Sequence, residues 1–186
     1  MFEFLFGKRK VAESQAKKNF SFPDSVMLDN VQLARNGEGV RKRFGMEIYE
    51  MALYLSSATT DARQAIALPG PKQLRFVAKR RLVGGMLGTA LLNGMRKNLP
   101  VGQEAFYLPY IGEIVKIFKT EPDIREGQTF RIDLLPDRGT HFYIADQLKG
   151  KPIQASGFNE AVLAIWLGRR PVDADLKRNL LAGVAK

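Results

Sequence analysis

The pattern of apolar and polar residues predicts several β-strands, the clearest of them within residues 128–146. There, apolar and polar residues alternate on both sides of the turn sequence PDRG, which is typical of a β-hairpin. Residues 31–34, 40–55 and 73–79 predict further strands, and an Asn-Gly pair at 36–37 predicts a turn between the first two. The strand at 40–55 has apolar residues on both faces, which indicates that it is covered on both sides. The two sets are Tyr49, Met51, Leu53 and Leu55 on one face, and Ile48, Ala52 and Tyr54 on the other.

Apolar residues spaced three to four positions apart predict helices at 82–98, 103–119 and 158–168. Pro109 is expected to interrupt the second of these helices. Asp61 and Asp173 each stand where an N-cap residue would begin a shorter helix. Strands, two long helices, a hairpin and further helices follow one another along the chain. This order predicts an α+β fold in which helices pack on an antiparallel sheet.

The composition fits one soluble domain and excludes cysteine chemistry. The 186 residues contain 45% apolar and 26% charged residues and no cysteine. We expect a tail over residues 1–21 and a single domain over 22–186. The net charge of +10 suggests an anionic partner. Because the basic residues are dispersed and no nucleic-acid-binding motif is present, we expect no nucleic-acid partner.

The N-terminal sequence MFEFLFGKRKVAESQAKK is not typical of a signal peptide, since its apolar part is short and precedes the charges. We therefore expect a cytoplasmic protein; a periplasmic location is the alternative if a signal peptide has been removed. No apolar run reaches the roughly 18 residues that a transmembrane helix needs. We expect no transmembrane segment.

Residues that common catalytic and metal sites require are missing. His141 is the single histidine, and no G-x-S-x-G motif accompanies it, which argues against a Ser-His-Asp triad and a multi-histidine metal site. His141 next to a turn is most simply a surface residue, and a lone axial contact to haem is the alternative. The GGMLG sequence at 84–88 does not follow a strand directly, as a dinucleotide-binding motif would. We therefore predict no cofactor, with haem kept as an alternative.

The Arg-Lys-Arg cluster at 41–43 stands at the start of an apolar strand. Arginines beside apolar and aromatic residues are common in small-molecule pockets. The guanidinium of Arg41 suits a carboxylate, because its planar fork donates two parallel hydrogen bonds. From these residues alone, an exposed ion pair between Arg41 and Glu38 or Glu47 is the simpler interpretation.

Two long blocks of the sequence resemble the chalcone isomerase fold, and most closely the bacterial chalcone isomerase-like proteins. They are LARNGEGVRKRFGMEIYEMALYL at 33–55 and FNEAVLAIWLGRRPVDADLKRNLLAG at 158–183. The order of elements between them agrees, so the resemblance covers about residues 22–183. It implies an open-faced β-sandwich, with a large antiparallel sheet, a layer of helices and a cleft between them. Plant isomerases of this fold close a flavanone ring in that cleft, fatty-acid-binding members hold a carboxylate there, and some members bind haem.

The resemblance also assigns roles to individual residues. Arg41 matches the family arginine, and Tyr49 matches a strand tyrosine of the fatty-acid-binding members, where the plant enzymes have threonine. The polar substrate-binding residue of the isomerases falls at Ile165, their catalytic tyrosine near Leu82 and its amide partner near Thr89. The loss of polar groups at two of these positions implies binding without catalysis. The chain of a ligand is then expected along Met51, Leu53, Leu87 and Leu91 toward Ile165.

We therefore predict a monomeric, non-catalytic protein that binds a fatty acid or a similar amphipathic carboxylate. Chalcone–flavanone isomerase activity is the first alternative. Haem binding through His141 or Tyr49 is the second. A basic protein that binds membranes or nucleic acid through its charge is the last.

Overall fold

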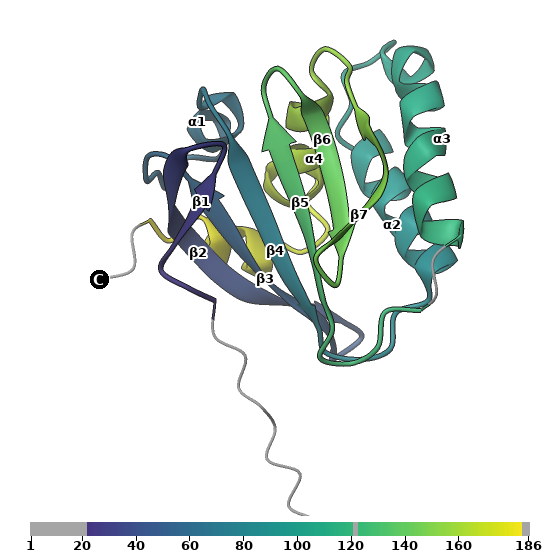
Figure 1. Cartoon of the computed structure of the whole chain (residues 1–186), viewed down its shortest axis with the longest axis horizontal. Coiled ribbons are helices and arrows are strands. Elements are labelled where there is room, and N and C mark those ends of the chain that lie inside the picture. The colour runs from purple at the N-terminus through teal and green to yellow at the C-terminus, as the bar shows by residue number, and fades with distance from the viewer. Residues whose placement is uncertain (1–21, 121–122, 184–186) are drawn as a thin grey trace, which may run out of the picture.

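The computed structural model describes residues 22–120 and 123–183, whose strands form one antiparallel seven-stranded sheet (Figure 1). The strands lie in chain order, so each pairs with its neighbours in the sequence. They are β1 (Ser25–Leu28), β2 (Val31–Arg43), β3 (Met46–Leu55), β4 (Lys72–Ala78), β5 (Thr129–Leu135), β6 (Gly139–Ile144) and β7 (Gln147–Ile153). The predicted tail at 1–21 lies outside the described residues.

Five helices of the described residues contribute to a large core on one face of the sheet, and Figure 1 shows them behind the sheet and at one side of it. They are α1 (Ala62–Ala67), α2 (Gly84–Arg96), α3 (Glu104–Thr120), α4 (Phe158–Leu167) and α5 (Ala174–Leu180). None of the helices in this part of the chain is long and apolar enough to cross a membrane. The predicted α+β class, with helices packed on an antiparallel sheet, is confirmed.

The helices begin where local sequence favours them. Asp61 caps α1 by accepting a hydrogen bond from the backbone N–H of Gln64, and Asp173 caps α5 in the same way. The expected break at Pro109 is wrong, because α3 continues through this residue. Buried residues from Ile111 to Phe118 pack α3 on the core, and this packing outweighs the single backbone hydrogen bond that proline cannot donate.

The predicted turn at Asn36–Gly37 is wrong, because both residues lie inside β2. Asn36 has no partner on β3 and forms a β-bulge. Its buried side-chain amide donates to the carbonyl of Leu180 at 2.8 Å. Gly37 lets the end of α5 approach, since a Cβ there would overlap the carbonyl oxygen of Asn179. The Asn-Gly pair therefore lets α5 pack on β2. The turn between β2 and β3 lies instead at residues 44–45, both with positive φ.

The two predicted faces of β3 are observed, with one exception. Met51, Leu53 and Leu55 belong to the helix-side core, and Ala52 and Tyr54 to a smaller cluster on the opposite, open face. Ile48 was expected on the open face but packs against the helix-side core. The register shifts here: Tyr49 pairs with Arg41 and Glu47 with Lys42, which leaves Ile48 as the extra residue of a second bulge. Such a bulge redirects a side chain.

Strands β1 and β7 were not predicted, because neither has a regular apolar pattern. The sequence of β7, QLKGKPI, contains a glycine and a proline, which are tolerated at the edge of a sheet. The predicted hairpin is confirmed as β5 and β6.

Candidate functional site

A cavity of about 250 Å³ lies where the end of the β2–β3 hairpin meets α2 and α4. Its wall is mostly apolar and its polar groups are almost all arginines. The lining residues are Ile48, Tyr49, Leu82, Val83, Met86, Leu87, Ala90, Leu91, Ile165, Trp166 and Val172, together with Arg41, Arg43, Arg80 and Arg81. Apolar walls with a few placed polar groups are typical of small-molecule sites.

Arg41 and Tyr49 are directly opposite each other on β2 and β3 and both line the cavity. Nη1 of Arg41 donates to the backbone carbonyl of Lys42 at 2.8 Å and lies 3.5 Å from Oδ2 of Asp173. The ion-pair partner is therefore Asp173, and the pairing with Glu38 or Glu47 considered from the sequence does not occur among the described residues.

Asp173 fixes Arg41 from the start of α5. Its carboxylate accepts from the backbone N–H groups of Asp175 and Leu176 at 3.0 Å each, and from that of Lys42 at 3.1 Å. Burial acts to raise the pKa of this carboxyl, but the hydrogen bonds from Leu176 and Lys42, with the charge of Arg41, outweigh it and hold the pKa below its usual range. Asp173 therefore stays ionised and ties β2 to α5.

Tyr49 is buried, with 7% of its surface exposed, and its hydroxyl accepts a hydrogen bond from Nε1 of Trp166 at 2.9 Å. Its ring meets that of Phe76 edge-on, with centroids 5.4 Å apart. Burial raises the pKa of Tyr49 to about 12, although the Trp166 hydrogen bond and the charge of Arg41 act to lower it. The phenol therefore keeps its proton at neutral pH. Because no described residue accepts that proton, Tyr49 can donate it to a group in the cavity.

The structure brings five of the eight predicted site residues together at this cavity: Arg41, Tyr49, Leu87, Leu91 and Ile165. Met51 and Leu53 lie on the same face of the sheet but are buried in the core and outside the cavity lining. Thr89 is on the exposed side of α2, where its hydroxyl donates to the carbonyl of Gly85 at 2.9 Å. The ligand-binding roles of all eight residues stay predictions.

Sequence reasoning did not find Trp166 or the link from Asp173 to Arg41. Asp173 was recognised only as a helix cap, which uses one of its carboxylate oxygens. The other oxygen accepts from the backbone N–H of Lys42 in β2, which is more than a hundred residues away in the sequence. For Trp166, the only signal was that it is the single tryptophan and adjoins Ile165, but no local pattern shows which hydroxyl its N–H meets.

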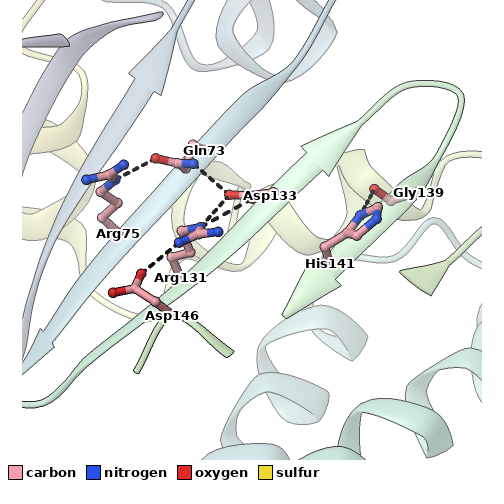
Figure 2. A network of polar contacts seen from close by, with 7 residues as sticks. All are labelled: Gln73, Arg75, Arg131, Asp133, Gly139, His141 and Asp146. Carbon is pink, nitrogen blue, oxygen red and sulfur yellow. Dashed lines mark hydrogen bonds and ion pairs between the residues drawn. The ribbon is translucent and has the colours of Figure 1, made fainter. Parts of the chain in front are cut away.

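A separate polar network occupies the open face of the sheet (Figure 2). Side chains from β4 and β5 meet there around the buried carboxylate of Asp133, which accepts from Gln73 at 2.7 Å and from Arg131. His141 lies on β6 opposite Asp133, and its Nδ1 is 3.2 Å from the carbonyl of Gly139. His141 and Tyr49 are thus on opposite faces of the sheet. Among the described residues, no three acidic or histidine side chains are close enough to hold a metal ion.

Comparison with known proteins agrees with this fold. The family model described as chalcone isomerase-like matches residues 14–182, and the chain belongs to this family. The crystal structure of a fatty-acid binding protein from Arabidopsis thaliana is similar, with a TM-score of 0.64, 16% sequence identity, and 90% of this chain and 94% of that chain covered. A search of curated proteins finds no match. The predicted open-faced sandwich of chalcone isomerase type is therefore confirmed.

Proposed function

We propose that this protein binds a fatty acid or a similar amphipathic carboxylate in the cavity between β2, β3, α2 and α4, and does not transform it. The observation that carries the proposal is the opposed pair of Arg41 and Tyr49 beside an apolar cavity. A charged donor and a neutral donor side by side suit a group that only accepts hydrogen bonds, and an ionised carboxylate is such a group.

The hydrogen-bonding capacity of both residues supports this. The carbonyl of Lys42 and the carboxylate of Asp173 both engage Nη1 of Arg41, and the Tyr49 hydroxyl is a further partner of the guanidinium. The five N–H groups of an arginine exceed these contacts, so donors are left for a ligand. Tyr49 accepts from Trp166 and so has its own O–H hydrogen to give. Asp173 limits the movement of Arg41, so less side-chain entropy is lost when a ligand binds.

The rest of the cavity suits an apolar chain. Leu87 and Leu91 of α2 and Ile165 of α4 form the wall beyond the polar pair. The volume of about 250 Å³ is slightly below the roughly 300–1,000 Å³ common for ligand pockets. We therefore expect a medium-length chain to fit inside and a longer one to extend through the mouth. The similar Arabidopsis structure is that of a fatty-acid binding protein, which is consistent with this ligand class.

Binding without catalysis is favoured over isomerase activity. The resemblance assigns a polar substrate-binding residue of the isomerases to Ile165 and their catalytic tyrosine to a position near Leu82. Both side chains line the cavity and offer no hydrogen bond. Tyr49, with a pKa raised to about 12, is also a poor general base near neutral pH. The cavity therefore has donors for a bound anion but lacks a proton acceptor suited to an isomerisation.

Native mass spectrometry of the purified protein, followed by extraction of any bound molecule, tests the proposal. We expect a co-purifying fatty acid that is absent from Arg41→Ala, while thermal unfolding of the variant stays close to that of the wild type. If the purified protein is empty, decanoate is added and its binding measured. Unchanged decanoate affinity in Arg41→Ala would rule out the proposed anchor, and chalcone turnover above the spontaneous rate would contradict the absence of catalysis.

A further inference from the structure

Exposed apolar side chains gather around the mouth of the cavity. Of the nine large apolar side chains that the described residues leave exposed, four are Phe44, Met46, Val83 and Met86. Val83 and Met86 line the cavity itself. Phe44 and Met46 are joined to it through two arginines of the lining: Arg43 lies over the Phe44 ring at 5.3 Å, and Nη1 of Arg80 is 2.9 Å from Sδ of Met46. We call these six residues the mouth surface.

Phe44 is the most unusual member of the mouth surface. It occupies the first position of the two-residue turn between β2 and β3, where φ is 50° at Phe44 and 74° at Gly45. Such turns favour asparagine and glycine, and a bulky residue there is uncommon. The side chain is 86% exposed, so its bulk contributes little to packing within the described fold. An exposed phenylalanine in a strained turn position is explained if it contacts something outside the chain.

The cations of the mouth surface indicate what that partner is. Neither Arg43 nor Arg80 pairs with a carboxylate among the described residues, whereas Arg81, beside them, pairs with Asp123. Unpaired cations interleaved with exposed phenylalanine and methionine are the combination that peripheral proteins bring to an anionic bilayer. A nucleic-acid backbone would attract the two arginines through its phosphates, but it offers no apolar region for the exposed phenylalanine and methionine side chains.

We propose that the mouth surface docks on an anionic lipid bilayer, with Phe44 and Met86 entering the interface and Arg43 and Arg80 beside the headgroups. The opening of the cavity would then face the membrane, where an amphipathic acid would enter or leave without crossing water. The docking rests on the surface alone, whereas its role in ligand transfer rests on the proposed function.

Co-sedimentation of the full chain with phosphatidylcholine vesicles, with and without phosphatidylglycerol, tests the docking. The apolar variant, Phe44→Asn with Met46→Gln, removes two apolar side chains of the mouth surface. Neither Phe44 nor Met46 lines the cavity. The control for this variant is Phe106→Gln with Leu108→Gln, two exposed residues at the start of α3. That helix runs antiparallel to α2, since Gly88 packs on Val115 and Arg96 pairs with Glu104, so the control lies at the far end from Met86. The charge variant is Arg43→Gln with Arg80→Gln, and its control is Arg63→Gln with Lys97→Gln.

We expect binding that requires phosphatidylglycerol, falls at least tenfold in each mouth-surface variant, and stays within about twofold of wild type in both controls. Equal losses in mouth-surface and control variants, or binding that does not depend on phosphatidylglycerol, would overturn the docking proposal. Decanoate binding without vesicles is measured on the wild type and on the apolar variant, and we expect both to bind it equally. Vesicle binding without decanoate binding would refute the proposed function alone, and the reverse result would refute the docking alone.

Discussion

Arg41 and Arg131 occupy opposite faces of the same sheet and differ in how far their donors are already used. Nε of Arg131 lies 3.2 Å from both oxygens of Asp133, and its Nη1 donates to Asp146 at 2.9 Å (Figure 2). Its guanidinium also stacks 3.8 Å from the centre of the Tyr143 ring. Arg41 has one carboxylate at 3.5 Å, one backbone carbonyl and the hydroxyl of Tyr49 at the cavity itself. An arginine with most donors engaged contributes to the fold, whereas one with free donors beside a cavity can bind a ligand.

The residues around the two arginines also differ, being polar around Arg131 and mostly apolar around Arg41. Around Arg131, polar side chains satisfy each other: Asp133 accepts from Gln73, and Gln73 in turn accepts from Arg75. Around Arg41, the cavity wall is apolar apart from Tyr49 and further arginines. The sequence shows an arginine on a strand in both cases, and only the tertiary contacts distinguish a structural role from a binding role.

The largest expected effect is on stability, from Arg131→Met. This variant leaves the buried carboxylate of Asp133 without its cation, so we expect the free energy of unfolding to fall by about 3 kcal/mol. Decanoate affinity should not change, because the network lies on the open face. Urea unfolding and calorimetric titration measure the two quantities. A weaker decanoate affinity in the folded variant would show that the two faces are coupled.

The next effect is on affinity, from Arg41→Met. Removing a charged hydrogen-bond donor from a bound carboxylate costs about 2 kcal/mol, or about 30-fold in Kd. The unfolding free energy should fall by less than about 1 kcal/mol, because the pair with Asp173 is partly exposed and other groups still bind that carboxylate. Decanoate titration checks the affinity. If this variant lost more stability than Arg131→Met, the structural role would belong to Arg41 instead.

A smaller effect on affinity is expected from Tyr49→Phe. The variant removes one neutral donor, so we expect about a fivefold weaker Kd for decanoate, equivalent to about 1 kcal/mol. Tyr54→Phe is the matched control, since Tyr54 lies on the open face and donates to the carbonyl of Pro23 at 2.8 Å. The same titration measures both variants, and an equal loss in the control would remove Tyr49 from the site.

The last effect concerns pH, and it is absent near neutral pH because it appears only under alkaline conditions. Burial raises the pKa of Tyr49 to about 12 from 10.0, so the folded protein holds this proton more tightly than the unfolded chain does. The stability from this group is therefore complete below pH 10 and is lost as the pH rises from 10 through about 12. Tyr54 behaves in the same way. Absorbance titration of the tyrosines should show one fewer group ionising above the usual tyrosine range in Tyr49→Phe. An unchanged titration curve would contradict the raised pKa of Tyr49.

Most elements could be predicted from the sequence, because local patterns carry their signals. The hairpin of β5 and β6, the long helices and the caps at Asp61 and Asp173 all depend on residues close together in the chain. The predicted turn at 36–37 is wrong because this Asn-Gly pair contacts the end of α5 instead of forming a turn. Asn36 donates to the carbonyl of Leu180, 144 residues further along the chain, and Gly37 leaves room for the helix backbone. No local pattern contains that contact.

The site was predicted in part for the same reason. Only the family resemblance paired Arg41 with Tyr49, because the sequence pattern placed both on one strand at 40–55. In the structure a turn at 44–45 divides this segment and sets the two residues opposite each other on β2 and β3. Met51 and Leu53 were placed in the ligand path because they share a face with Tyr49, but deeper on this face the helices pack directly on the sheet and leave no room. Thr89 was placed by the resemblance alone, and the rotation of α2 that turns this residue outward depends on how the helix packs on its neighbours.

The most direct test of the central claim compares decanoate with its uncharged methyl ester by calorimetric titration, in the wild type and in Arg41→Met. If Arg41 anchors a carboxylate, the wild type should bind the acid at least tenfold more tightly than the ester, and the variant should bind the two about equally. Equal affinities for acid and ester in the wild type, or a preference for the acid that survives in Arg41→Met, would contradict the role of Arg41 as the anchor.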